Sequence, residues 1–347
     1  MEYRPLGRTG IKVSAICLGS MTWGVQNTQD EGFEQMDYAL DQGVNFIDTA
    51  EMYPVPTKED SYGRTEEIIG NWLAARGKRD KVTIATKIVG PNPKRFHYIR
   101  GGETRFNRKH IAAAVETSLK RLKTDYIDLY QLHWPDRATN DFSSLAYTHE
   151  DGAEETPVEE TLEALDAVVK AGKVRHVGLS NENPWGAMRF LAAAEQGKGP
   201  RMASVQNPYS FLNRSFETRM AEIAMREDLG LLAYAPLAAG TLTGKYLGGQ
   251  RPEGSRRRLW PENVRYQGPQ SDAATAAYVE LARERGLDPA QLALAFVLSR
   301  PFLTSAIIGA TKMTQLKTNI EAAKVSLDEE TLEAIEAIHK VYTYPCP

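Results

Sequence analysis

Eight short, apolar, β-rich runs alternate with longer segments of helical periodicity along the whole chain. The runs lie at residues 15–18, 44–47, 82–86, 127–132, 174–179, 203–206, 231–234 and 305–308. Several are continuously apolar, which is typical of parallel strands that are covered on both faces. Between two of them, residues 110–122 place Ile111, Val115, Leu119 and Leu122 on one helical face. The alternation predicts repeated strand–helix units around a parallel sheet.

Eight strands that are each followed by a helix favour a closed (β/α)8 TIM barrel over an open sheet, and we expect residues 1–347 to form one domain of this α/β class. Residues 3–13 predict an N-terminal β-hairpin that covers the bottom of the barrel. The connections at 89–106, 134–156 and 236–270 are too long for simple turns. All three follow strands, so they should crowd the C-terminal face, where such barrels hold their active sites.

Charge and composition exclude several classes of partner. The chain has 42 basic and 45 acidic residues, a net charge of −3, which predicts no electrostatic binding of nucleic acid or anionic membranes. No apolar run approaches the roughly 20 residues needed to cross a bilayer. The N-terminus shows no apolar signal core, so a cytoplasmic location is expected. Cys17 and Cys346 have no nearby partner cysteine and are expected to be reduced thiols.

Four titratable residues fall at the C-terminal ends of three successive predicted strands. Asp48 ends the second strand, Tyr53 follows on its loop, Lys87 ends the third strand and His133 ends the fourth. Taken singly, each has an ordinary structural explanation: a helix cap, a loop aromatic, a strand-end lysine and a core histidine. Their coincidence at one mouth of a barrel predicts a catalytic site instead.

The four side chains suit the reduction of a carbonyl group by hydride. The alkoxide that hydride leaves must receive a proton, and Tyr53 is the expected general acid, although an unperturbed phenol has a pKa of about 10. A neighbouring Lys87 ammonium would lower that pKa, and a buried Asp48 carboxylate would keep Lys87 charged and in place. His133 would donate a hydrogen bond to the substrate oxygen and orient it.

Neither a Rossmann module nor a metal site is expected. No G-x-G-x-x-G motif follows a predicted strand. The remaining histidines, at positions 97, 110, 149, 176 and 339, show no ligand spacing with cysteine or carboxylate residues. The hydride donor must therefore be held in another way.

Three ordered motifs resemble those of the aldo-keto reductases, and the resemblance covers essentially the whole chain. They are residues 43–53 (GVNFIDTAEMY), 84–87 (IATK) and 128–135 (DLYQLHWP). Within that family, residues 19–24 (GSMTWG) and 341–345 (VYTYP) resemble the bacterial Tas-type members. The resemblance implies a (β/α)8 barrel that binds NADP(H) without a Rossmann fold, and it supports the four catalytic roles.

The resemblance also implies a set of cofactor contacts. Ser180, Asn181 and Gln206 would hold the nicotinamide carboxamide, which both donates and accepts hydrogen bonds. Tyr234 would stack on the nicotinamide ring. The other implied cofactor residues are Ser20, Met21, Asp48, Pro236, Leu237, Gly240, Lys245, Arg256, Gly309, Thr311, Gln315 and Asn319. Residues 236–245 would cover the pyrophosphate, and residues 309–319 would close the cradle at a helix N-terminus.

The expected cofactor is NADPH rather than NADH. Arg256 resembles the arginine beside the adenine and its 2′-phosphate, although the basic run at 256–258 reads equally as a solvated loop. Two positions depart from many relatives: Ala310 stands where they carry a lysine, with Lys312 two residues on, and Thr318 stands where they carry a glutamate.

Trp23, Met52 and Trp134 are expected to line the substrate pocket, which favours aldehydes and ketones with aryl or alkyl groups. Two other functions remain open. One is an NADP(H)-binding regulatory or redox-sensing subunit, as in the potassium-channel β subunits, which resemble this chain but have asparagine in place of His133. The other is a class I aldolase with a Schiff base on Lys87, which Asp48 disfavours by keeping the amine protonated. No sequence feature indicates an oligomeric state.

Overall fold

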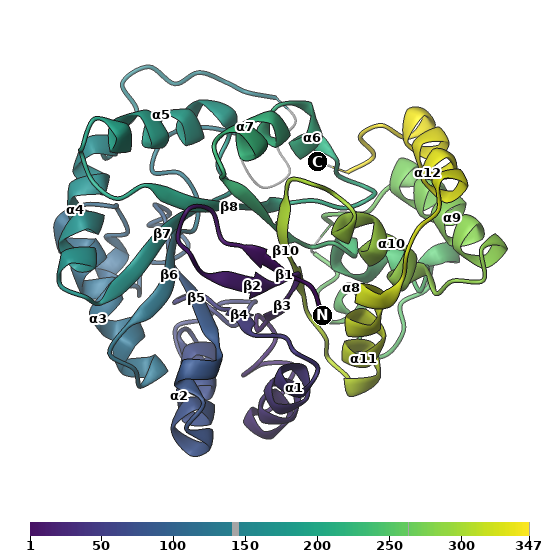
Figure 1. The fold of residues 1–347 in the computed structure, drawn as a ribbon, viewed down its shortest axis with the longest axis horizontal. Helices are drawn as coiled ribbons and strands as arrows, with labels where there is room; N and C mark the ends of the chain where they lie inside the picture. Colours follow the sequence, from purple (N-terminus) through teal and green to yellow (C-terminus); the bar gives the residue numbers. More distant parts are fainter. Residues whose placement is uncertain (141–145, 263, 347) are drawn as a thin grey trace.

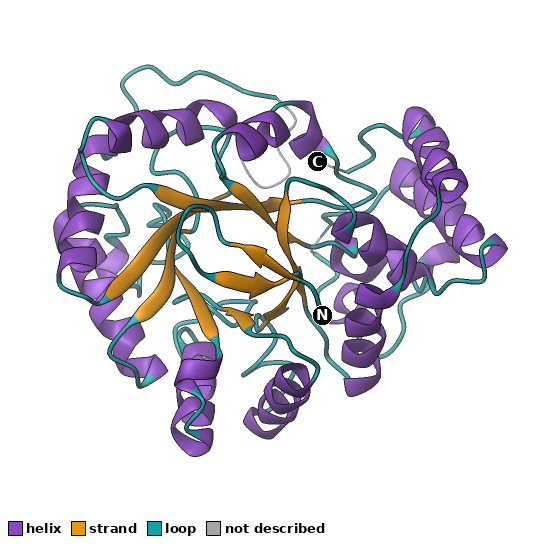
Figure 2. Ribbon diagram, viewed as in Figure 1, coloured by secondary structure: helices purple, strands orange, loops and turns teal. Residues whose placement is uncertain are grey.

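The computed structural model describes residues 1–140, 146–262 and 264–346. Eight parallel strands form a closed barrel in the order β10-β3-β4-β5-β6-β7-β8-β9, with helices around it (Figure 1; Figure 2). The strands are β3 (Ile16–Gly19), β4 (Phe46–Asp48), β5 (Thr83–Ile88), β6 (Ile127–Leu132), β7 (Val174–Ser180), β8 (Met202–Pro208), β9 (Gly230–Tyr234) and β10 (Leu303–Ile308). The predicted TIM barrel is confirmed.

Helices follow the strands in turn. They are α1 (Gln29–Asp41), α2 (Arg64–Arg76), α3 (Arg108–Leu122), α4 (Val158–Lys170), α5 (Pro184–Glu195), α6 (Ser215–Thr218), α7 (Met220–Arg226), α8 (Arg256–Leu259), α9 (Pro269–Glu284), α10 (Pro289–Leu298), α11 (Met313–Glu321) and α12 (Glu329–Val341). Short 3₁₀ turns are η1 (Arg79–Lys81), η2 (Arg100–Gly102), η3 (Ala238–Thr243), η4 (Leu247–Gly249) and η5 (Ala322–Lys324). Strand boundaries differ from the predicted ones by one to two residues at most ends, because backbone pairing decides them. Val44, for example, donates its N–H to Ala39 O at the end of α1 instead of starting β4.

The predicted N-terminal hairpin closes the bottom of the barrel. Strands β1 (Tyr3–Pro5) and β2 (Lys12–Ser14) pair in antiparallel fashion and lie across the barrel opening (Figure 1). Leu6 and Val13 pack against the inward side chains of the strands, including Phe46 and Leu129. Gly7 has φ +52°, and a Cβ at this position would lie 2.3 Å from Ala203 O, so only glycine allows the hairpin to approach β8 this closely.

The main hydrophobic core lies between the barrel and its helices. Helix α3 shows how the sequence produces it: Ile111, Val115, Leu119 and Leu122 are all buried, as their spacing predicts. The Asn107 side chain accepts the His110 N–H and so caps the helix N-terminus. Burial of such apolar helix faces against the parallel strands is the main favourable contribution to the folding free energy.

The predicted long connections all leave the C-terminal ends of strands. The segment between β5 and α3 contains η2, and the segment between β9 and α9 contains η3, η4 and α8. The connection between β6 and α4 includes residues 141–145, which lie outside the described residues. In the described part of the chain, no helix has the length and apolar character to cross a membrane. Cys17 and Cys346 are both free and buried.

Candidate active site

The four residues predicted to be catalytic lie on three neighbouring strands. Asp48 ends β4, and Tyr53 follows on the turn toward α2. Lys87 lies in β5, and His133 directly follows β6. Because β4 pairs with β5 and β5 pairs with β6 in parallel, all of these residues reach the same end of the barrel. The structure therefore brings them together, as the sequence predicts.

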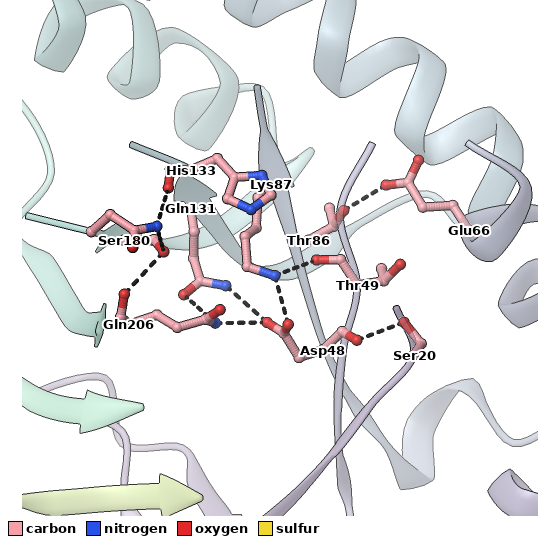
Figure 3. A network of polar contacts seen from close by, with 11 residues as sticks. Ser20, Asp48, Thr49, Glu66, Thr86, Lys87, Gln131, His133, Ser180 and Gln206 are labelled. Carbon is pink, nitrogen blue, oxygen red and sulfur yellow. Dashed lines mark hydrogen bonds and ion pairs between the residues drawn. The ribbon is translucent and has the colours of Figure 1, made fainter. Parts of the chain in front are cut away.

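A buried ion pair forms the centre of this site (Figure 3). Lys87 Nζ donates to Asp48 Oδ1 over 2.6 Å and to the carbonyl oxygen of Thr49 over 2.8 Å. The Lys87 side chain is fully closed to solvent and that of Asp48 is 4% exposed. Burial, the largest single effect, acts to lower the pKa of Lys87, but Asp48 and Tyr53 together outweigh it and the pKa is raised. Lys87 is therefore a permanent buried cation.

Two amide side chains complete the surroundings of Asp48. Gln206 Nε2 donates to Asp48 Oδ2 over 2.8 Å, and Gln131 Nε2 donates to the same oxygen over 3.2 Å. Gln131 Oε1 in turn accepts from Gln206 Nε2 over 3.2 Å. Both carboxylate oxygens are thus hydrogen-bonded, which is what a buried charge requires. Gln131 escapes prediction from the sequence motifs, although a lone amide in a buried apolar strand is a usable signal.

Tyr53 lies against the lysine and the histidine. Lys87 Nζ is 4.9 Å from the centroid of the Tyr53 ring, and the Tyr53 and His133 rings meet edge to face with centroids 5.7 Å apart. Burial raises the pKa of Tyr53 above its ordinary value, while the Lys87 ammonium acts to lower it. The Lys87 effect has the expected sign, but burial outweighs it. At neutral pH Tyr53 is therefore a protonated phenol, the form that can give up a proton.

His133 is neutral at neutral pH. Burial first, and then repulsion from Lys87 and Arg95, hold the pKa of His133 well below its ordinary value. Its Nδ1 atom is buried without a hydrogen-bond partner among the described residues. A neutral imidazole carries one N–H donor, so this side chain can orient a carbonyl oxygen without competing as the acid.

The residues expected to hold a nicotinamide carboxamide line the adjoining strand ends. Ser180 Oγ donates to Gln206 O over 2.9 Å, and Asn181 Nδ2 donates to His133 O over 2.8 Å. Tyr234 Oη, at the end of β9, donates to Asn181 Oδ1 over 2.7 Å. These hydroxyl and amide groups form one connected network beside the four residues predicted to be catalytic.

The remaining expected cofactor residues fall on three segments around the mouth. Ser20 Oγ donates to Asp48 O over 2.7 Å, and Met21 O accepts the N–H of Val55 over 3.1 Å, so the segment after β3 borders the catalytic turn. Residues Pro236, Leu237, Gly240 and Lys245 lie at or within η3 and the turn that follows. A Cβ on Gly240, which has φ +88°, would lie 2.8 Å from Lys245 Nζ. A side chain there would fill the space in front of the lysine.

The third segment precedes and begins α11. Gln315 Oε1 accepts the Thr311 N–H over 3.0 Å, and Asn319 Nδ2 approaches Gly309 O at 3.5 Å. Lys312 is the N-cap residue of α11 and makes no capping hydrogen bond, and the position of a Gly309 Cβ is open space. An uncapped helix N-terminus beside open space suits a phosphate.

Cations without carboxylate partners stand near these segments. Arg256, at the start of α8, and Lys245 form no ion pair with any described residue. Burial lowers the pKa of the Arg256 guanidinium. Arg265 escapes prediction because its loop has no periodicity: its Nη2 approaches Tyr234 Oη at 3.3 Å. Cations with no ion-pair partner among the described residues, the α11 N-terminus without a side-chain cap and an amide cluster are a donor set that fits a dinucleotide phosphate cofactor.

The three residues predicted to line the substrate pocket lie in two different apolar clusters. Met52 and Trp134 belong to a compact cluster above the barrel with Ala50, Val89, Phe96 and Ile99, and Tyr53, Val55, Tyr62 and Tyr98 pack against it. Trp23 does not belong to this cluster, and its place in the pocket wall stays a prediction. It is fully buried in the main core, where Nε1 donates to Gln35 Oε1 over 3.1 Å and the ring packs near Gly32 of α1.

Within the described ranges, no group of three or more His, Cys, Asp or Glu side chains could hold a metal ion.

Comparison with known proteins agrees with the geometry. The model of the aldo/keto reductase family matches residues 15–340. Protein tas of Escherichia coli (strain K12) is 50% identical over 347 residues and covers the whole of both chains. Uncharacterized oxidoreductase YrpG of Bacillus subtilis (strain 168) is 37% identical over 97% of this chain and 96% of its own. A probable voltage-gated potassium channel subunit beta of Arabidopsis thaliana is 33% identical over 94% and 92% of the two chains. These matches show that the chain is an oxidoreductase of the aldo/keto reductase family.

Proposed function

We propose that the protein reduces aldehydes and ketones to alcohols, with NADPH as the reductant and Tyr53 as the general acid. The observation that carries this proposal is the buried Lys87, held by Asp48 at 2.6 Å with the Tyr53 ring 4.9 Å away. A fixed cation beside a protonated phenol stabilises the phenolate that forms as the proton leaves. This arrangement favours proton donation from Tyr53 to a developing alkoxide.

NADPH, when bound, supplies the hydride for the carbonyl carbon. Ser180, Asn181 and Gln206 would hold its carboxamide, and Tyr234 would support the nicotinamide ring. Lys245, Arg256 and the N-terminus of α11 would hold its phosphates, since these groups have no competing carboxylate among the described residues. The preference for NADPH over NADH rests on Arg256, together with Lys312, as partners for the 2′-phosphate.

The chain's own residues move one proton and hold one oxygen. The Tyr53 Oη proton moves to the carbonyl oxygen as that oxygen gains charge, and Lys87 stabilises the phenolate left behind. Asp48, itself held by Gln131 and Gln206, keeps Lys87 charged and in place. His133, neutral because burial and Lys87 lower its pKa, donates a hydrogen bond to the same carbonyl oxygen. The aromatic cluster around Met52 and Trp134 favours substrates with aryl or alkyl groups.

Two measurements test the proposal. Fluorescence titration with NADPH and NADH should show saturable binding that is tighter for NADPH, and a panel of aldehydes and ketones should oxidise NADPH, followed at the nicotinamide absorbance. Tyr53→Phe should lower kcat by about 10²- to 10⁴-fold while NADPH still binds. Tyr278→Phe is the matched control, because it removes a buried hydroxyl of the outer core that has no hydrogen-bond partner among the described residues.

Two results would contradict the proposal. If Tyr53→Phe keeps its kcat within about tenfold of the unmodified protein, Tyr53 is not the acid. If NADPH binds but no carbonyl in the panel is reduced, a regulatory nucleotide-binding role becomes the better explanation.

A further inference from the structure

A buried ion pair lies two residues before Tyr53 on the same turn. Arg100 donates to Glu51 through both terminal nitrogens, Nη1 to Oε2 over 2.6 Å and Nη2 to Oε1 over 3.0 Å. The Glu51 side chain is 2% exposed and that of Arg100 is 15% exposed. A bidentate contact of this kind fixes direction as well as distance. None of the four catalytic roles uses this pair.

Glu51 joins the Tyr53 turn to the strand that carries Lys87. Its backbone N–H donates to Lys87 O over 3.1 Å, and its side-chain Oε1 accepts the Val89 N–H over 2.6 Å. Glu51 therefore contacts β5 on both sides of Ile88. Tyr53 N–H closes the turn by donating to Ala50 O over 3.0 Å. Glu51 thus fixes the position of the turn that carries Tyr53 relative to the strand that carries Lys87.

Arg100 joins the same turn to the pocket wall. It lies in η2 with φ +48°, and Gly101 and Gly102 follow with φ +67° and +87°. A non-glycine residue adopts this left-handed conformation at a cost in free energy, so surrounding contacts must hold it. The same segment supplies Phe96 and Ile99 to the aromatic and apolar cluster that includes Met52 and Trp134. The Arg100 contact therefore anchors that wall to the catalytic turn.

A second buried pair nearby provides a comparison. Arg121 Nε donates to Glu66 Oε2 over 2.7 Å, with side-chain exposures of 15% and 0%. Glu66 also accepts from the Thr86 hydroxyl on the outer side of β5. This pair joins α2, α3 and β5. Among the described residues it forms no hydrogen bond or ion pair with residues 50–56 or 92–102, although the charge of Arg121 acts on Arg100 and that of Glu51 acts on Arg121. Burial of either ion pair carries a desolvation cost in free energy. Only the Glu51–Arg100 pair connects the turn that carries Tyr53 with the segment at 92–102.

We propose that Glu51 and Arg100 are positioning residues for the reductase reaction: together they fix Tyr53 relative to Lys87 and tie the aromatic wall of the substrate pocket to that acid. This inference rests on the proposed function. The pair touches neither substrate nor cofactor, and it acts through Tyr53. Binding of a substrate against Phe96 and its neighbours is thereby linked to the geometry of proton donation.

The test compares Glu51→Gln with Glu66→Gln. Glu51→Gln keeps the side-chain shape but removes the charge that both Arg100 nitrogens contact, and kcat should fall about 10- to 100-fold through misplacement of the acid. The dissociation constant for NADPH should stay unchanged. Both variants break a buried ion pair, so Glu66→Gln should lower the melting temperature about as much as Glu51→Gln does. Its kcat should stay within about twofold of that of the unmodified protein. Arg100→Lys retains the positive charge, so its kcat should lie between that of Arg100→Met and that of the unmodified protein.

Hydrogen exchange gives a readout that does not depend on turnover. In Glu51→Gln, peptides that cover residues 50–56 and 92–102 should exchange faster together, whereas Glu66→Gln should leave both near the unmodified rate. The proposal is overturned if Glu66→Gln lowers kcat as much as Glu51→Gln, or if Glu51→Gln accelerates exchange in neither peptide. Absence of turnover in the unmodified protein would overturn the proposed function instead, and the exchange result would still decide whether Glu51 couples the two segments.

Discussion

Lys87 Nζ and Asp48 Oδ1 lie 2.6 Å apart in a part of the barrel that is almost closed to solvent. Removing either partner would leave an uncompensated buried charge, which is far more costly than removing both. The pair is therefore less a source of stability than a means of keeping a cation in one place beside Tyr53. The presence of this cation should therefore be measurable as a change in the pKa of Tyr53.

Lys87→Met should change the pH dependence of the reverse reaction, alcohol oxidation. That direction requires Tyr53 as phenolate, and Lys87 is the group that lowers the pKa of Tyr53 against the effect of burial. Without Lys87 the pKa rises further, so the increase of kcat/KM with pH should move to higher pH. Near neutral pH the reduction rate should fall by about 10²-fold or more. A profile that stays in place, or moves to lower pH, would show that Lys87 does not tune Tyr53.

The barrel and the meeting of Asp48, Tyr53, Lys87 and His133 at one end of it could be predicted because strand ends are local features. Asp48, Lys87 and His133 each terminate or follow an apolar run, and parallel pairing around a closed ring brings such ends together. Gln131 could not be assigned in the same way. Its role depends on Gln206, 75 residues later in the chain, which shares Asp48 Oδ2 with it.

The packing of Trp23 could not be predicted from the sequence. Trp23 follows β3 at the end of the barrel that carries the site, but the side of the loop to which its ring turns is decided by packing. The Gln35 amide and the space beside Gly32 draw Trp23 outward into the helical layer. The contacts of Arg265 and Arg100 could not be predicted either, because their loops have no periodicity and their partners lie far away in sequence.

The two tryptophans should therefore respond differently to replacement by phenylalanine. Trp23→Phe leaves a cavity and removes the donor to Gln35, which should cost about 3 kcal/mol of folding free energy with little change in KM. Trp134→Phe alters the wall that stacks on Phe96, with ring centroids 5.7 Å apart, and should change KM for aryl aldehydes several-fold. Urea unfolding and steady-state kinetics on both variants separate the effects. A larger change in KM for Trp23→Phe than for Trp134→Phe would instead place Trp23 in the pocket wall.

Arg256 and Arg257 are adjacent but should have different functions. Arg257 Nη2 donates to Tyr266 O over 2.7 Å and approaches Thr241 Oγ1 at 3.2 Å, so it fastens the loop to η3. Arg256 has no such partner among the described residues. Arg256→Ala should weaken NADPH binding about 10- to 100-fold and NADH binding much less, whereas Arg257→Ala should mainly lower the melting temperature. Equal losses for both nucleotides in Arg256→Ala would remove Arg256 from the 2′-phosphate site.

Buried tyrosines should make the fold sensitive to alkali. Burial raises the pKa of Tyr130, Tyr209, Tyr266 and Tyr278 above the ordinary value. The unfolded chain ionises these groups near pH 10, while the native state keeps their protons, so the unfolded state binds fewer protons and stability falls as pH rises above about 10. Each such group should contribute a slope of up to about 1.4 kcal/mol per pH unit. Urea unfolding at increasing pH should show this decline, and Tyr278→Phe should reduce it, whereas Tyr147→Phe, at an exposed ring, should not. Equal slopes for the two variants would mean that burial of Tyr278 does not hold its proton in the folded state.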